Sequence, residues 1–351
     1  MKLALIYSGG TIGCAGVPLM PLPANEFQTL WGRHVAPRLG RDVALDWHWL
    51  EPALDSCEMT PANWIDLARM AIFSDGRQAT LLLHGTDTMA WTAAALAFLL
   101  TLYDRDGSAV ARLRQPVVLT GAQRPLFTSD GILPGTDALA NLDGAIEVCG
   151  ENIPGVTVAF GGTVLPGARV MKMSTSDDRA FECPKGAAPC PVLPPATAME
   201  VLAQLDRLAP QFGAKALVSV TPLPSASDVV YGQIASLING LGEKLGAIHL
   251  NGFGIGNFPS RSVLSPLLRA AHDRGILIVA GSQVPHGDVD PSTYGAGHWL
   301  GELGAISTAD MATPAVHAKL YLALALGAMN GWSQAEMERH FLTPVAGELR
   351  G

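Results

Sequence analysis

The sequence is poor in cysteine and in charge. It has five cysteines in 351 residues, a thin and odd set for a secreted disulfide scaffold, and no Cys-x-x-Cys or His/Cys spacing that favours a metal site. Charged residues make up 15% and the net charge is −8, which argues against a surface that binds nucleic-acid phosphates. No uncharged apolar stretch reaches membrane-spanning length, and the apolar run at residues 3–7 is too short for a signal peptide. We therefore expect a reduced, cytoplasmic protein with no metal and no membrane or nucleic-acid partner.

Two common nucleotide-binding motifs are also missing. Residues 2–7 predict a buried strand that ends in a glycine-rich turn, but glycines at 9, 10, 13 and 16 fit no register of the dinucleotide fingerprint. No Gly-Lys-Ser/Thr phosphate loop is present either. What remains is a tight turn that presents the hydroxyl of Thr11 between glycines, whose free backbone N–H groups suit an oxyanion. The alternative is a glycine turn with an incidental threonine.

Residues 80–100 are the stretch around which the rest of the chain is organised. Residues 80–83 predict a short buried strand, a polar turn follows at 84–88, and the next residues predict a helix that is apolar on nearly every side. A strand that enters a helix through such a turn places its polar residues at the carboxyl edge of a parallel sheet, where open α/β sheets bind ligands. A plain helix N-cap is the alternative explanation for Thr and Asp in this turn.

The chain is long enough for two α/β domains of ordinary size. A helix that starts at Thr60-Pro61 leads into the strand at 80 and completes a βαβ pattern. We predict an N-terminal domain at residues 1–192, a proline-rich linker at 193–213 and a C-terminal α/β domain at 214–351. The C-terminal domain is expected to include a strongly amphipathic helix at about 310–328 that opens with Asp310.

Two threonine-bearing turns resemble those of the bacterial-type L-asparaginase family. They are Gly9-Gly10-Thr11-Ile12-Gly13 and His84-Gly85-Thr86-Asp87-Thr88-Met89, and the match extends over essentially the whole chain. Further family-like segments are Asp55-Ser56-Cys57-Glu58-Met59-Thr60-Pro61, closest to the cytoplasmic type I branch, Gly121-Ala122-Gln123, Gly167-x-Arg169-x-x-Lys172 and Gly254-Ile255-Gly256-Asn257. The resemblance implies a two-domain fold, with a mostly parallel N-terminal sheet flanked by helices and a smaller C-terminal α/β domain.

The resemblance also implies the site residues. Its catalytic set would be Thr11, Thr86, Asp87 and Lys172, and its substrate-binding set would be Ser56, Cys57, Ala122 and Asn257. Thr11 would form an acyl-enzyme, and Thr86–Lys172–Asp87 would activate it or the later water, as a triad does with other residues. The residues alone leave open which threonine attacks first. No metal or organic cofactor is required, and the Asn257 motif, which closes a neighbouring subunit's site in the family, implies a homo-oligomer, either a dimer or a tetramer.

The implied reaction is hydrolysis of L-asparagine to L-aspartate and ammonia. A glutaminase or broader ω-amidase is the alternative, because one methylene separates the two substrates and is worth about 1–3 kcal/mol. A catalytically weak asparagine sensor is a third hypothesis. It draws on a departure from the family, whose members usually carry a Tyr in the loop after the first threonine, whereas residues 12–30 contain none. This loop, residues 14–25, is predicted to be a lid that closes through Leu19, Met20 and Leu22, and Cys57 stands where relatives often have a polar side chain.

Overall fold

Buried apolar runs form a six-stranded sheet at the centre of the first of two structural units. The computed structural model describes residues 1–39, 43–73, 76–128, 131–224, 228–260 and 263–350. The first unit comprises Met1–Leu102, Ala109–Cys183 and Val192–Asp206, and the second comprises Tyr103–Ser108, Pro184–Pro191 and Arg207–Gly351. The sheet has the strand order β10-β9-β8-β5-β1-β4, and all neighbours are parallel except β10 and β9. Its strands are β1 (Lys2–Gly9), β4 (Ala44–Leu54), β5 (Ala79–Leu83), β8 (Pro116–Thr120), β9 (Gly155–Phe160) and β10 (Thr163–Pro166).

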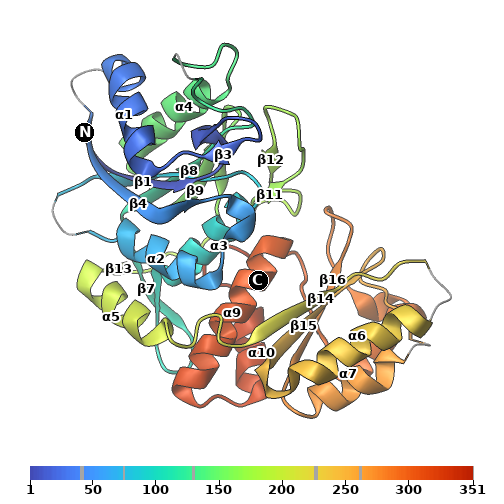
Figure 1. Ribbon diagram of the computed structural model, residues 1–351. Helices are drawn as coiled ribbons and strands as arrows, with labels where there is room; N and C mark the ends of the chain where they lie inside the picture. The colour runs from blue at the N-terminus through green and yellow to red at the C-terminus, as the bar shows by residue number, and fades with distance from the viewer. Residues whose placement is uncertain (40–42, 74–75, 129–130, 225–227, 261–262, 351) are drawn as a thin grey trace. The chain divides into compact units, whose positions relative to one another are not determined.

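Helices cover both faces of this sheet (Figure 1). On one face α1 (Ala24–His34) and α4 (Ala138–Gly150) bury their apolar residues against alternate residues of the strands, such as Leu3, Leu5 and Leu81. On the other face lie α2 (Pro61–Ala71) and α3 (Met89–Leu99). The helix α3 is buried on every side, as the apolar residues after the 84–88 turn predicted. This confirms the mostly parallel, helix-flanked N-terminal sheet.

Smaller sheets extend the first unit. One has the order β13-β7-β6, and two are antiparallel pairs, β2 with β3 and β11 with β12. Their strands are β2 (Cys14–Ala15), β3 (Met20–Pro21), β6 (Thr101–Tyr103), β7 (Ala109–Leu113), β11 (Met171–Lys172), β12 (Phe181–Glu182) and β13 (Pro195–Ala196).

The stretch 193–213, predicted as a linker, carries regular structure. It contains β13 and the helix α5 (Ala198–Leu208), and the part up to Asp206 is grouped with the first unit. The helix starts in a reciprocal cap, in which Glu200 accepts from the Thr197 backbone N–H at 2.8 Å and donates its own N–H to the Thr197 hydroxyl at 3.2 Å. Its apolar face buries Val201, Leu205 and Leu208. The predicted limits 1–192 and 214–351 themselves stay a prediction.

The second unit is a smaller α/β layer structure. A four-stranded parallel sheet, β14-β15-β16-β17, packs on one face against α6, α7 and α8 and on the other against α9 and α10. Its elements are β14 (Ala216–Val220), α6 (Asp228–Leu241), β15 (Leu245–Gly252), α7 (Leu264–His272), β16 (Leu277–Ser282), α8 (Gly295–Leu303), β17 (Ile306–Ser307), α9 (Thr313–Asn330) and α10 (Gln334–Leu342).

The predicted helix at 310–328 is corrected in two respects. The helix α9 begins at Thr313 with Pro314 in its first turn, and Asp310 lies before it and forms an ion pair with Arg350 at 3.2 Å. It is also not amphipathic, because buried residues occur on all of its sides, including Lys319.

Candidate active site

The two threonine-bearing turns leave adjacent strands at the switch point of the first sheet. The strand β1 pairs with β4 on one side and with β5 on the other, and Tyr7 lies opposite Leu83 at the end of the β1–β5 ladder. The connections therefore reverse direction at β1, and such a point is where open parallel sheets form a ligand crevice beyond the carboxyl ends of their strands. Thr11 follows β1 and Thr86 follows β5 at this edge.

Glycines bring these two turns into backbone contact. A Cβ on Gly10, whose φ is +77°, would lie 2.2 Å from the Cα of Gly85, so neither position tolerates a side chain. The residues that follow are Thr11, which is half-buried, and Thr86, which is 4% exposed. The glycines at these two positions thus allow the two hydroxyl-bearing turns to pack in direct backbone contact.

Lys172 connects the second turn to a separate hairpin. It ends β11, which pairs with β12, and its Nζ lies 2.8 Å from the Thr86 Oγ1 and 2.7 Å from the Asp87 Oδ1. The lysine side chain is 16% exposed, whereas that of Asp87 is 64% exposed. A hydroxyl, an amine and a carboxylate therefore form a continuous hydrogen-bonded path along which a proton can move. Three of the four predicted catalytic residues are in direct contact.

The buried His84 ring holds the backbone of the turn by hydrogen bonds to the Gly85 carbonyl and to Thr92 of α3. The ring is fully buried, Nδ1 lies 2.7 Å from the Gly85 carbonyl oxygen, and Nε2 lies 2.9 Å from the Thr92 hydroxyl, which also accepts from the Trp64 indole N–H at 3.0 Å. Since the Gly85 carbonyl can only accept, Nδ1 carries the ring proton, and in the neutral ring Nε2 then accepts from the Thr92 hydroxyl. Burial lowers the pKa of His84 to about 4, so the ring is neutral at pH 7. It holds the backbone of the turn and is not aimed at a substrate.

Ser56 and Cys57 differ in their surroundings. Ser56 is 3% exposed and packs so closely on Gly85 that a Cβ there would lie 2.4 Å from its hydroxyl oxygen. Its carbonyl accepts from the Thr88 hydroxyl at 2.6 Å, which joins this loop to the Thr86 turn. Cys57 is exposed, and its backbone N–H is bound by the Asp55 carboxylate at 3.2 Å. Ser56 therefore lies beside the predicted catalytic turn, and Cys57 follows it in the same loop.

The other two predicted substrate-binding residues lie in different units. Ala122 is fully buried in the turn after β8, so that only its backbone can serve a ligand. Asn257 lies in the second unit, where its backbone N–H and C=O pair with those of Phe253, both at 2.8 Å. Its side-chain oxygen is buried without a hydrogen-bond partner among the described residues. Its contact with a substrate stays a prediction.

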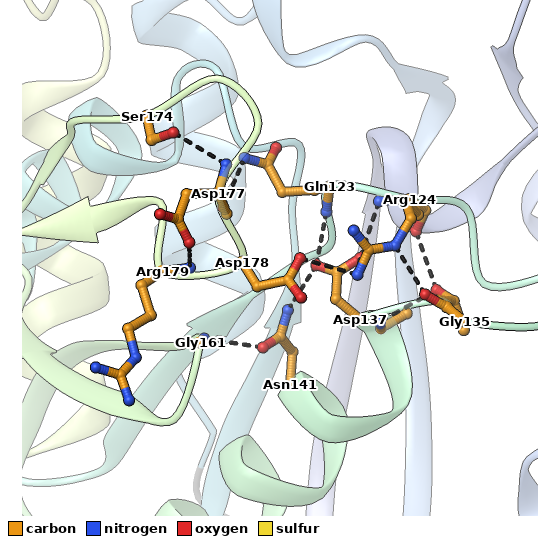
Figure 2. A network of polar contacts seen from close by, with 12 residues as sticks. Gln123, Arg124, Gly135, Asp137, Asn141, Gly161, Ser174, Asp177, Asp178 and Arg179 are labelled. Atoms are coloured by element: carbon orange, nitrogen blue, oxygen red, sulfur yellow. Dashed lines mark hydrogen bonds and ion pairs between the residues drawn. The ribbon is translucent and has the colours of Figure 1, made fainter.

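A buried polar pair beneath the β8 turn was not predicted from the sequence (Figure 2). The Asp137 carboxylate accepts from the backbone N–H of Gln123 at 2.8 Å and of Arg124 at 2.9 Å. The Asn141 amide donates to the Gly121 carbonyl at 3.1 Å and accepts from the Gly161 N–H at 2.9 Å. An acid and an amide four residues apart at the start of α4 look like ordinary helix-surface residues, so the sequence offers only a faint signal for this role.

The loop at 14–25 forms a short hairpin, β2–β3, that leads into α1. No tyrosine lies in it, but Tyr7 lies beneath it and donates its hydroxyl to the Leu22 carbonyl at 3.0 Å. Burial and the nearby Cys14 thiol raise the pKa of Tyr7, whose ring stacks on Phe27 at 4.2 Å. The tip of the hairpin is apolar and exposed, with Leu19 at 51% and Met20 at 63%. Its role as a lid stays a prediction.

Comparisons with known proteins agree with this architecture. Residues 2–192 match the family model described as Asparaginase, N-terminal, and residues 233–341 match that described as Glutaminase/Asparaginase C-terminal domain. The chain is 31% identical over 338 residues to L-asparaginase 1 of Escherichia coli strain K12, covering 92% of this chain and 91% of the relative. The structure of L-asparaginase I from Vibrio cholerae superposes with a TM-score of 0.73 at 27% identity, over 99% of this chain and 98% of that one. The structure of the thermostable L-asparaginase from Thermococcus kodakarensis has a TM-score of 0.75 at 24% identity and is covered completely, as is this chain, which supports the fold.

The fold and the family comparisons identify a two-domain α/β amidohydrolase. More specifically, the chain belongs to the asparaginase family. The type I designation of the E. coli and V. cholerae relatives agrees with the branch that the motif at residues 55–61 indicated. Among the described residues, no helix is long and apolar enough to cross a membrane, and no group of three or more metal-binding side chains could hold an ion.

Proposed function

We propose that the protein hydrolyses L-asparagine to L-aspartate and ammonia through an acyl-enzyme on Thr11. The observation that carries this proposal is the bridging position of Lys172, whose Nζ is within 2.8 Å of the Thr86 hydroxyl and within 2.7 Å of the Asp87 carboxylate. Such a relay can remove a proton from the Thr86 hydroxyl. Thr11 lies in the neighbouring turn at the switch point, which contacts the Thr86 turn through Gly10 and Gly85.

The reaction has two halves. The Thr11 Oγ attacks the side-chain amide carbon of the substrate, its proton passes by way of the Thr86–Lys172–Asp87 relay to the leaving nitrogen, and the C–N bond breaks to release ammonia. Water then attacks the carbonyl carbon of the resulting ester and loses its proton to the Thr86–Lys172–Asp87 relay. The bond between this carbon and the Thr11 oxygen breaks, the relay returns the proton to that oxygen, and aspartate leaves. The proposed donors to the oxyanion in both halves are backbone N–H groups of the turn around Thr11 other than those of Gly10 and Gly13, which already donate to the Leu54 and Gly10 carbonyls.

The substrate would be held by residues within and beside the relay. We propose that Asp87, whose side chain is exposed, binds the α-ammonium group, and that Ser56 binds the α-carboxylate. Ala122 would contribute its carbonyl to the substrate amide, and Cys57 lies at the rim. We further propose that Asn257 completes the site of a second copy in a homo-oligomer, and that the five free cysteines suit a reducing, cytoplasmic compartment.

L-Glutamine is the second candidate substrate. The model that matches residues 233–341 covers glutaminases as well as asparaginases by its description. One added methylene changes binding by about 1–3 kcal/mol, so both amides can be substrates of one pocket with unequal rates.

Ammonia release from the purified protein tests the proposal. We expect turnover with L-asparagine, slower turnover with L-glutamine, and none with either amide for Lys172→Met. A protein that binds asparagine, as seen by calorimetry, but releases no ammonia would be a sensor, and a faster reaction with glutamine would reassign the substrate.

A further inference from the structure

Two contacts join the turn after β8 to the loop of the hairpin that carries Lys172 (Figure 2). The Arg124 guanidinium lies 2.8 Å from the Asp178 carboxylate, and the Gln123 side-chain amide donates to the Asp177 carbonyl at 3.2 Å. Residues 173–180 are the loop between β11 and β12, so these contacts act on the segment directly after Lys172.

The β8 side of this junction is firmly held. Asp137, at 7% exposed, binds two successive backbone N–H groups of the turn, and Asn141, at 4% exposed, binds the Gly121 carbonyl. Gly121 in turn packs on the residue before the Thr86 turn, since a Cβ on it would lie 2.2 Å from the His84 carbonyl oxygen. The position of Arg124 is therefore tied to that of Thr86 and Asp87.

The Lys172 side has little stiffness of its own. Its two strands are two residues long, and the loop between them is closed by the Met173 N–H on the Ala180 carbonyl at 2.7 Å and by turns within Ser174–Arg179. An isolated two-stranded hairpin is marginal in water even when it is longer than this one. Contacts outside the hairpin must then fix where Lys172 lies. The buried Phe181 of β12 packs on Phe160 with ring centroids 5.0 Å apart, and the exposed loop beyond it is held by Arg124 and Gln123.

We propose that Arg124 and Asp178 are positioning residues, whose ion pair holds the Lys172 hairpin at the distance from Thr86 and Asp87 that proton transfer needs. The effect of this ion pair on catalysis rests on the proposed function, whereas its effect on the position of the hairpin does not. The pair is half exposed, with side chains 38% and 59% accessible, so it contributes little to stability, as exposed ion pairs generally do. Displacement of a reacting group by about 1 Å can nevertheless cost about 100-fold in rate.

The chain provides a matched control. Arg69 and Asp206 also form an ion pair at 2.8 Å in the same unit, with side chains 38% and 68% accessible. Among the described residues, no hydrogen bond or ion pair joins either of them to a predicted site residue. Asp178→Asn and Asp206→Asn therefore remove the same charge from pairs of equal length and similar exposure.

The test measures kcat and KM for asparagine, and hydrogen–deuterium exchange of the peptide 171–180. Asp178→Asn should lower kcat roughly tenfold with KM changed by less than about twofold, and should speed exchange in 171–180. Asp206→Asn should do neither, Asp178→Glu should recover most of the loss, and Arg124→Gln combined with Asp178→Asn should be no slower than either alone.

Wild-type kcat and wild-type exchange in Asp178→Asn would overturn the proposal, as would equal losses in Asp178→Asn and Asp206→Asn. A wild-type protein that releases no ammonia from asparagine or glutamine would refute the proposed function instead. In that case the exchange comparison decides alone, because faster exchange in Asp178→Asn but not in Asp206→Asn supports the positioning role and equal exchange overturns it.

Discussion

Lys172 contacts Thr86 and Asp87 directly, and no hydrogen bond joins it to Thr11 among the described residues. The two threonines therefore have unequal surroundings, although both follow strands at the same sheet edge. Thr86 is buried and already accepts a hydrogen bond from the amine, whereas Thr11 is half-buried in a turn bordered by glycines. This difference supports the division between a threonine that attacks and one that handles protons.

Three buried histidines and the partly buried His317 are neutral at pH 7, and this has a consequence for stability. Burial lowers the pKa of His84, in the first unit, to about 4. In the second unit, burial lowers the pKa of His249 to about 3, of His317 to about 4 and of His340 to about 4, with His317 adding to the effect on His249 and Lys319 to that on His340.

Acid should therefore destabilise the second unit more than the first. A histidine whose folded pKa lies below its unfolded value of about 6.5 takes up its proton on unfolding, so its contribution to stability is complete above pH 6.5 and is lost as the pH falls toward 4. Within that window, each such histidine lowers the free energy of unfolding by about 1.4 kcal/mol for every pH unit of acidification. Calorimetric scans at pH 7.5 and 5.5 should show the second unit's transition moving more than that of the first. Equal shifts, or none, would contradict these pKa directions.

The short hairpin β2–β3 is the element predicted to act as a lid. Its tip exposes Leu19 and Met20, and its base is bound by the Tyr7 hydroxyl through the Leu22 carbonyl. A closing lid would bury these apolar side chains over the substrate, and lids that complete a site affect turnover when altered.

Replacing Leu19 and Met20 together by Ser should lower kcat/KM for asparagine roughly tenfold. Ile153→Ser, which alters another exposed apolar residue of the same unit, is the control and should leave the rate unchanged. Steady-state kinetics identical to wild type in the double variant would leave the hairpin without a catalytic role.

The end of the chain is held by a buried ion pair in the second unit. Lys319 of α9 and Glu348 are both fully buried and paired, Lys319 also donates to the Thr343 carbonyl at 2.6 Å, and Glu348 accepts from the Ala346 N–H at 2.7 Å. Removal of one partner leaves a buried charge without compensation.

Glu348→Ala should accordingly lower the free energy of unfolding of the second unit by about 3–5 kcal/mol. Chemical unfolding measures this change. In calorimetric scans, the transition that Glu348→Ala shifts is that of the second unit. Glu302→Ala, at an exposed position in α8, should change it by less than about 0.5 kcal/mol. A similar small effect for Glu348→Ala would show that the pair does not anchor the segment.

The pattern of apolar residues predicted those elements whose burial is visible in their own sequence. The strands β1 and β5 are continuous apolar runs that end in turn residues, and each lies within two residues of its predicted bounds. The helix α9 was misjudged because both of its sides are buried, which no pattern of its own residues reveals, and because Asp310 looked like a cap although Thr313-Pro314 marks the start. Arg124, Asp137, Asn141 and Asp178 were missed because their contacts join segments far apart in sequence.

At the level of the whole molecule, Asn257 is the predicted site residue that lies outside the first unit. Its side-chain oxygen is buried yet unpaired among the described residues, an arrangement that a ligand or a second chain would satisfy. The family resemblance assigns this motif to a neighbouring subunit's site, so the account requires at least a dimer.

Sedimentation of the purified protein should therefore show a dimer or tetramer at assay concentration, and activity should fall on dilution below the dissociation range. Asn257→Ala should raise KM for asparagine without changing the sedimentation of the oligomer. An active monomer would contradict this part of the account.

The most direct test of the central claim is intact-protein mass spectrometry after acid quench of a reaction with asparagine. Thr11→Val should show no covalent species, whereas Thr86→Val should accumulate an aspartyl ester on Thr11, because acylation is slow and release is slower without the proton relay. Rates alone do not separate the two variants, since residues that act as a unit lose nearly the whole effect when either is removed. An adduct that maps to Thr86, in the wild type or in Thr11→Val, would reverse the assigned roles, and the absence of an adduct in every variant would favour direct attack by water.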